Sequence, residues 1–166
     1  MQDQEFNDIV REYSEPLYWH IRGIVNSHDD ADDILQDTFV KIWRSLPDFR
    51  GESAVSTWVW RIATNEALSF LRKKRVRAML QFKSVDEETE RTVSGDPWFN
   101  GDEAARKLSV AIAKLPDKQR AVFQMRYYEE MPYEQIADIT GTSVGALKAS
   151  YHLAQEKIKE QLNLLQ

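Results

Sequence analysis

The sequence predicts an all-α protein made of two small helical domains, a helical bundle and a helix-turn-helix, joined by a flexible acidic linker. Three observations support this prediction. Apolar residues recur at the three- and four-residue spacing of amphipathic helices along most of the 166 residues. No stretch alternates apolar and polar residues for long enough to indicate a strand. Residues 81–103 have no apolar stripe and contain two glycines and a proline, which is typical of a linker.

The first domain, residues 1–80, carries three apolar stripes at helical spacing. The first stripe comprises Phe6, Ile9, Val10, Tyr13, Leu17, Ile21 and Ile24. Pro16 lies inside it and predicts a kinked or split helix. The second stripe runs from Ile34 to Ile42 and stops before Pro47. The third runs from Val55 to Leu71, and Ser53 is positioned to be its N-cap.

The second domain, residues 104–166, ends in a helix–turn–helix pattern. One helix is predicted near residues 104–115, and another begins at Pro116. A short helix after Tyr133 ends at Gly141, which can supply a left-handed turn, and Ser143 can cap a long final helix. The spacing of Ala137, Gly141 and Ser143 favours a DNA-binding helix-turn-helix over an ordinary helical hairpin. The buried seam of the long helix is predicted to be Leu147, Tyr151, Ala154, Ile158, Leu162 and Leu165.

Composition and charge narrow the class of protein. The chain has no cysteine, which excludes disulfides and thiolate metal sites. Its start lacks the pattern of a signal peptide, and no apolar run is long enough to span a membrane, so we expect a cytoplasmic protein. The net charge is −5, but the charges are distributed unevenly along the chain. Residues 1–49 carry four basic and eleven acidic side chains, whereas residues 50–80 carry seven basic and two acidic ones. This division indicates two surfaces with different partners.

The acidic segment HDDADDILQDTF has three possible interpretations. Asp29, Asp30 and Asp33 match an aspartate-rich magnesium and diphosphate motif, but a second acidic motif and room for the large cavity of such enzymes are both lacking. The three histidines are scattered, so no metal site is expected. The acidic first turn of a helix and a surface for a protein partner remain as alternatives.

The basic run LRKKRVR, residues 71–77, has two interpretations. Cations are favourable at the C-terminus of any helix. Cations near aromatic side chains also suit a single strand of DNA, because bases stack on the rings while the charges meet phosphates. Trp58 falls on the apolar stripe and is predicted to be core, whereas Trp60 lies off the stripe and is the better stacking candidate.

Two long segments together resemble a known family. DADDILQDTFVKIWRSLPDFRGESAVSTWVWRIATNEALSFLRKKR resembles region 2 of the extracytoplasmic-function (ECF) group of RNA polymerase sigma factors. LPDKQRAVFQMRYYEEMPYEQIADITGTSVGALKASYHLAQEKI resembles their region 4. The resemblance implies region 2 in residues 1–80, a linker in 81–103 and region 4 in 104–166.

The resemblance also implies which residues meet each partner. The face toward core RNA polymerase would comprise Asp33, Gln36, Asp37, Thr38, Lys41 and Trp43. The loop from Phe49 through Arg50 to Ser53 would capture a base flipped out of the minus-ten element. The melted strand and its phosphates would be held by Trp60, Arg61, Asn65, Arg72, Lys73, Lys74 and Arg75. The minus-thirty-five element would meet the groove-facing set Thr142, Ser143, Gly145, Ala146, Lys148, Ala149, Ser150 and His152.

By the same resemblance the protein would be a sigma factor that gives core polymerase its promoter specificity and helps to melt DNA. It would be neither an enzyme nor a cofactor-binding protein, and no glycine-rich phosphate loop is present. Its partners would be core polymerase, promoter DNA and an anti-sigma factor, which is often membrane-anchored in this family. The alternative is a stand-alone helix-turn-helix regulator, which leaves the tryptophan-rich and basic segment unexplained.

Overall fold

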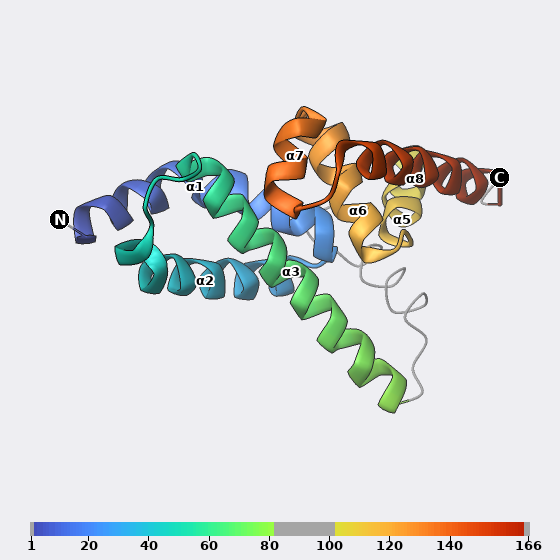
Figure 1. Cartoon of the computed structure of the whole chain (residues 1–166). Helices are drawn as coiled ribbons and strands as arrows, with labels where there is room; N and C mark the ends of the chain where they lie inside the picture. The colour runs from blue at the N-terminus through green and yellow to red at the C-terminus, as the bar shows by residue number, and fades with distance from the viewer. Residues whose placement is uncertain (1, 82–101, 165–166) are drawn as a thin grey trace.

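The computed structural model describes residues 2–81 and 102–164, and within these ranges the chain is helical without strands (Figure 1). The N-terminal part contains α1 (Gln2–Val25), α2 (His28–Ser45), the 3-10 turn η1 (Leu46–Asp48) and α3 (Val55–Leu80). The C-terminal part contains α5 (Glu103–Ala113), α6 (Asp117–Phe123), the π-helical η2 (Gln124–Tyr128), α7 (Tyr133–Thr140) and α8 (Val144–Leu164). The predicted all-α fold is confirmed.

The first three long helices pack against one another, and a side-chain cap fixes the start of α2. Ser27 caps α2 by accepting a hydrogen bond from the Asp30 N–H at 3.3 Å. Of the two alternatives predicted at Pro16, the split is wrong, because α1 is one helix that contains Pro16. Pro16 is exposed, so water can satisfy the carbonyl that its missing N–H leaves free. Ser53 is not the N-cap of α3, since that position belongs to Ala54.

The second domain is organised around its helix-turn-helix. Asp102 caps α5 through the Ala105 N–H at 2.8 Å, and Pro116 immediately precedes α6 as predicted. Gly141 ends α7 with a φ of 74°, in the left-handed region that glycine favours, which confirms the predicted turn. Of the predicted seam of α8, Leu147, Ala154 and Ile158 are buried, while Leu165 lies outside the described residues.

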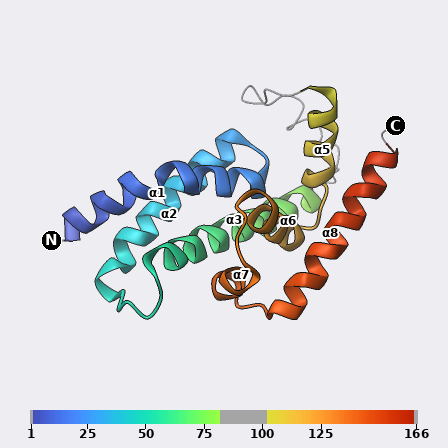
Figure 2. The same cartoon turned by 90° about the horizontal axis from the view of Figure 1, so that it is seen from above.

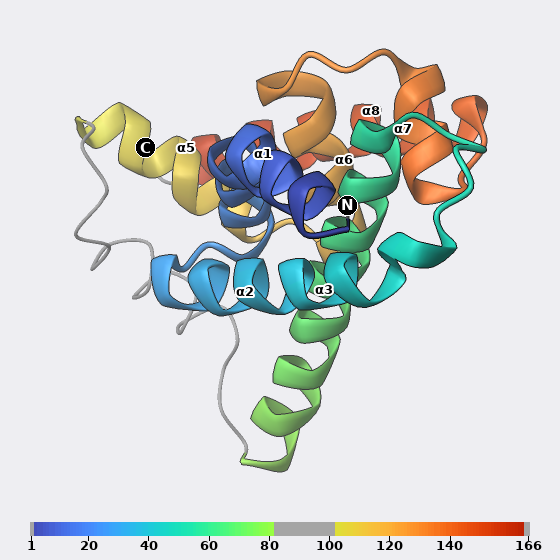
Figure 3. The ribbon, with the colours of Figure 1, turned by 90° about the vertical axis from the view of Figure 1, so that its left-hand side faces the viewer.

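The two domains are packed directly against each other. Figure 2 shows α1 and α2 on one side and α5 and α8 on the other, with α3 running between them, and one apolar cluster includes Leu17 and Ile21 of α1 together with Val122 of α6 and Met125 of η2. The C-terminal half of α3 extends beyond the other helices (Figures 1 and 3). The sequence predicted two domains but not this contact.

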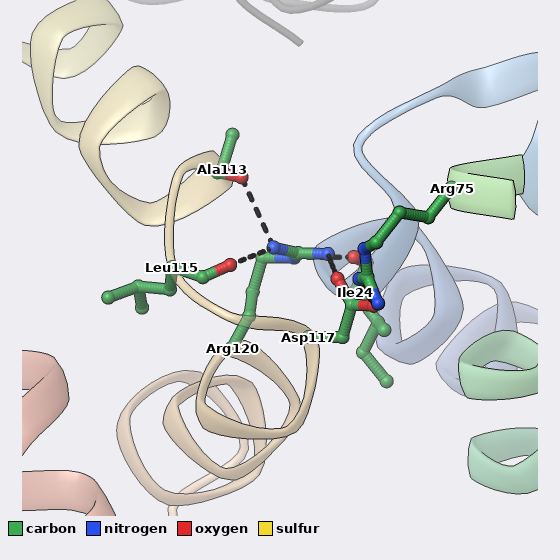
Figure 4. Close-up of polar contacts among 6 residues, drawn as sticks. All are labelled: Ile24, Arg75, Ala113, Leu115, Asp117 and Arg120. Carbon is green, nitrogen blue, oxygen red and sulfur yellow. Dashed lines mark hydrogen bonds and ion pairs between the residues drawn. The ribbon is translucent and has the colours of Figure 1, made fainter. Parts of the chain in front are cut away.

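A buried arginine joins the domains at the end of α1. Arg120 of α6 is 3% exposed, and its Nε donates to the Ile24 carbonyl at 2.6 Å (Figure 4). Its other nitrogens donate to the carbonyls of Ala113 and Leu115 and to Asp117. Burial, with a smaller contribution from Arg75, lowers the pKa of the Arg120 guanidinium to about 10, so the side chain stays charged at neutral pH.

The predicted linker falls almost entirely on residues 82–101, outside the described residues. Across the described ranges, no helix is both long enough and apolar enough to cross a membrane.

Candidate nucleic-acid interface

The segment that joins η1 to α3 forms the rim of an open pocket. Gly51 bends it with a φ of 72°, a left-handed conformation. The pocket encloses about 490 Å³, within the range of about 300–1,000 Å³ that is usual for sites that bind small molecules. It is lined by Asp48, Phe49, Arg50, Glu52, Ser53, Trp58 and Arg61. Four of the predicted DNA contacts (Phe49, Arg50, Ser53 and Arg61) therefore meet at one place.

One wall of this pocket is aromatic and is flanked by cations. The rings of Phe49 and Trp58 stack with centroids 4.6 Å apart and planes inclined by 29°. Both side chains are half-buried, so each keeps part of its surface open. Arg50 and Arg61 belong to the same lining, which also holds two acidic side chains. A flat apolar wall next to guanidinium groups suits a nucleobase and its phosphate.

The two tryptophans of α3 have the opposite environments to those that the sequence predicted. Trp58 lines the pocket, although its position on the apolar stripe predicted a core residue. Trp60, the predicted stacking platform, is only 9% exposed, and its indole N–H donates to Glu129 at 2.8 Å. The reason is that the second domain covers the side of α3 that carries Trp60. A signal for Trp58 was available, because it lies five residues after Ser53 of the loop.

The basic end of α3 contains cations in different environments. Arg72 and Lys73 are exposed in the C-terminal half of α3. Lys74 forms an ion pair with Asp30 at 3.2 Å, and Arg75 pairs with Asp117 of α6. Two of the four predicted phosphate contacts are thus held within the chain. Asn65, one turn after Arg61, is exposed.

The predicted polymerase-binding face lies along the outer side of α2. Five of its members are exposed: Asp33, Gln36, Asp37, Lys41 and Trp43. Thr38 is fully buried, and its hydroxyl donates to the Ile34 carbonyl at 2.7 Å, so its assignment to this face is corrected. Trp43 rests edge-on against Phe6 of α1, with centroids 5.1 Å apart, and Lys41 pairs with Glu66 of α3.

The helix-turn-helix presents its second helix to solvent. The Ser143 hydroxyl accepts a hydrogen bond from the Ala146 N–H at 3.2 Å, which confirms the predicted cap. The Lys148 ammonium lies 5.9 Å from the centroid of the Tyr133 ring. Ser150 is half-buried, and the other predicted groove-facing residues are exposed: Thr142, Ser143, Gly145, Ala146, Lys148, Ala149 and His152. Their contact with DNA stays a prediction.

Comparisons with known proteins agree with this arrangement. Residues 9–77 match the family Sigma-70 region 2, and residues 105–158 match Sigma-70, region 4. The ECF RNA polymerase sigma factor SigW of Bacillus subtilis is 30% identical over 96% of this chain and 90% of its own length. The RNA polymerase sigma-H factor of Pseudomonas aeruginosa is 29% identical over 96% of this chain and 87% of its own length.

Solved structures show the same fold. The sigma factor RpoE of Bartonella quintana, in complex with the anti-sigma factor NepR, has a TM-score of 0.74 at 22% identity over 96% of this chain and 98% of its own. CnrH, in complex with the cytosolic domain of CnrY, has a TM-score of 0.66 at 23% identity over 98% of this chain and 90% of its own.

Proposed function

Because the chain belongs to the sigma-70 family of RNA polymerase sigma factors, in its ECF group, we propose a division of labour among the surfaces described above. The protein is a transcription initiation factor that binds core RNA polymerase, directs it to specific promoters and promotes melting of the DNA. It works by binding and has no catalytic chemistry of its own. Its place of action is the cytoplasm, where core polymerase and promoters are found.

The outer face of α2 is the surface for core polymerase. Its exposed acids give a basic partner both attraction at a distance and a defined register. Exposed Trp43 adds an aromatic group, the kind of side chain that often contributes most to the affinity of an interface.

The pocket between η1 and α3 receives a base from the minus-ten element. Flipping a base out of the duplex costs a few kcal/mol, which stacking on aromatic side chains can offset at about 1–3 kcal/mol per base. Phe49 and Trp58 provide the stacking surface, and Arg50 and Arg61 attract the adjoining phosphates. Selective binding of the unpaired strand is how the protein favours melting.

Region 4 reads the minus-thirty-five element with the first turns of α8. Lys148 is the one permanently charged member of the groove-facing set, so phosphate attraction there is weak and occupancy depends on tethering to polymerase. An anti-sigma factor is a further partner. We take residues 1–80, 81–103 and 104–166 as region 2, linker and region 4.

The observation that carries the residue assignments is the convergence of Phe49, Trp58 and Arg61 in one open pocket. The test replaces Phe49 by alanine and measures promoter melting with permanganate. We expect open-complex formation to fall by about tenfold, since a stacking surface worth about 1–3 kcal/mol is lost. Binding to core polymerase should change by less than about twofold, because α2 is untouched.

Trp19→Ala provides the matched control, since Trp19 is an exposed aromatic residue of α1, outside the pocket. Normal melting by the Phe49 variant would contradict the assignment of the pocket. The alternative of a stand-alone regulator is not favoured, because the match to region 2 accounts for the segment that such a regulator leaves unexplained. Failure of the wild-type protein to copurify with core polymerase would revive that alternative.

A further inference from the structure

A carboxylate of the second domain is held by two donors of the first. Glu129 follows η2, and one of its oxygens accepts a hydrogen bond from the Trp60 indole N–H at 2.8 Å. The other oxygen lies 2.7 Å from His20 Nδ1, which must donate, since a carboxylate only accepts. His20 is fully buried, and its Nε2 lies 2.8 Å from the Thr64 hydroxyl. Region 2 thus builds a site for one anion, and region 4 fills it.

The electrostatics of this contact favour an ionised carboxylate. Burial raises the pKa of Glu129, but the facing His20 and the hydrogen bonds from Trp60 and Gln124 outweigh that effect and hold the pKa below its ordinary value. The residue after it, Glu130, has a φ of 53°, a left-handed conformation that is uncommon for glutamate. Such strain persists where the surroundings determine the backbone and is frequent in segments that switch.

The same contact covers residues that are needed elsewhere. The family resemblance assigns Trp60 to the melted strand, and under the proposed function Arg61 attracts a phosphate of that strand. Here Trp60 is buried under Glu129, and the Arg61 guanidinium donates to the Asp138 carbonyl of α7 at 2.7 Å. By contrast, Asp33 and Asp37 of α2 are exposed, and α2 packs on α1 and α3. The packed arrangement therefore leaves the polymerase face open, while the second domain covers Trp60 and holds the Arg61 guanidinium.

We propose that this packing is a closed, autoinhibitory state, in which Glu129 occupies an anion site of His20 and Trp60 that a phosphate of the unpaired promoter strand takes when region 4 moves away. A phosphate resembles a carboxylate in charge and in offering several acceptor oxygens, so the two compete for the same donors. Core polymerase docks on α2 of the closed protein, and the strand enters only after the domains separate. The inference rests on the proposed function.

A reversible covalent lock tests the order of events. An ideal Cβ at Gly23 of α1 lies 3.0 Å from Gln124 Cγ. In a disulfide, the Cβ of one cysteine lies about 3 Å from the sulfur of the other. A cysteine sulfur in place of the Gln124 Cγ would therefore be at a suitable distance from a Cβ at position 23. The natural chain has no cysteine, so the double variant Gly23→Cys with Gln124→Cys can form this one bridge. The reduced form of the same protein is the matched control.

Two measurements are made on each redox form: capture of core polymerase, and capture of a fluorescent minus-ten single strand by the sigma factor with core present. We expect oxidation to weaken strand binding by about tenfold or more, since the phosphate loses its charge-assisted bonds, while core binding changes by less than about threefold. Equal strand binding by both forms would overturn the proposal. Loss of core binding on oxidation would also overturn it, because the lock would then act on polymerase docking.

A second variant tests the carboxylate itself. Glu129→Gln in the full chain without core should bind the strand about tenfold more tightly than wild type, because the competitor loses its charge. Glu134→Gln removes one exposed negative charge from α7 of the same domain and should change binding by less than about twofold. Equal effects of the two substitutions would reject a specific site. A reduced double-cysteine protein that fails to bind core polymerase would instead count against the proposed function.

Discussion

At the scale of single residues, Arg120 shows how one buried charge organises a domain. Three backbone carbonyls, those of Ile24, Ala113 and Leu115, depend on its guanidinium (Figure 4). Replacing Arg120 by methionine keeps much of its volume but leaves those acceptors without their donor. We expect the free energy of unfolding to fall by about 3 kcal/mol or more, as for other broken buried pairs. Urea denaturation measures it, and Lys118→Met, exposed two residues earlier, should cost less than about 0.5 kcal/mol. Equal costs would mean that the buried network contributes little.

At the scale of elements, α2 separates a structural side from an exposed acidic side. Ala31, Ile34, Thr38 and Ile42 are buried, whereas Asp33 and Asp37 lie exposed one turn apart. Reversing both charges, Asp33→Lys with Asp37→Lys, should weaken binding to core polymerase by about tenfold or more, or about 1.4 kcal/mol, while the helical circular dichroism spectrum is unchanged. The charge-matched control is Glu5→Lys with Glu15→Lys, on exposed positions of α1. Titration of labelled core decides between them, and unchanged affinity of the α2 variant would remove this helix from the interface.

At the scale of the whole molecule, the closed packing depends on a close approach at Gly23. A Cβ added there would lie 1.9 Å from the Gln124 side-chain oxygen, so the Gln124 side chain must move, and its Nε2 would give up the hydrogen bond that it donates to Glu129. We expect Gly23→Ala to destabilise the contact between the domains by about 1–3 kcal/mol and to increase the separation of dyes placed on α3 and α8. Gly145→Ala is the control, since an added Cβ there meets nothing within 4 Å. Unchanged dye separation in the Gly23 variant would show that the contact tolerates the extra methyl group.

The sequence by itself determined the local elements and the two-domain plan, because these depend on neighbours along the chain. Helical spacing predicted the long helices, and Gly141 and Ser143 marked the turn and the cap of the helix-turn-helix. The sequence also predicted that the loop after η1 forms a site, since Phe49, Arg50 and Ser53 lie close together along the chain. These features need no knowledge of what packs on them.

Only the tertiary structure decided which side of each helix is free. Thr38 looked available for a partner, but its position relative to α1 and α3 buries it, and its hydroxyl finds a partner within α2. Trp58 and Trp60 differ by two positions on α3: Trp58 lines the pocket, whereas Trp60 is bound by Glu129 of the second domain, 69 positions further along the chain. The apolar stripe of a helix predicts one buried face. It does not predict which further residues are buried when distant segments cover the helix on other sides. The competition between Glu129 and a DNA strand is visible for the same reason only once the two domains are placed together.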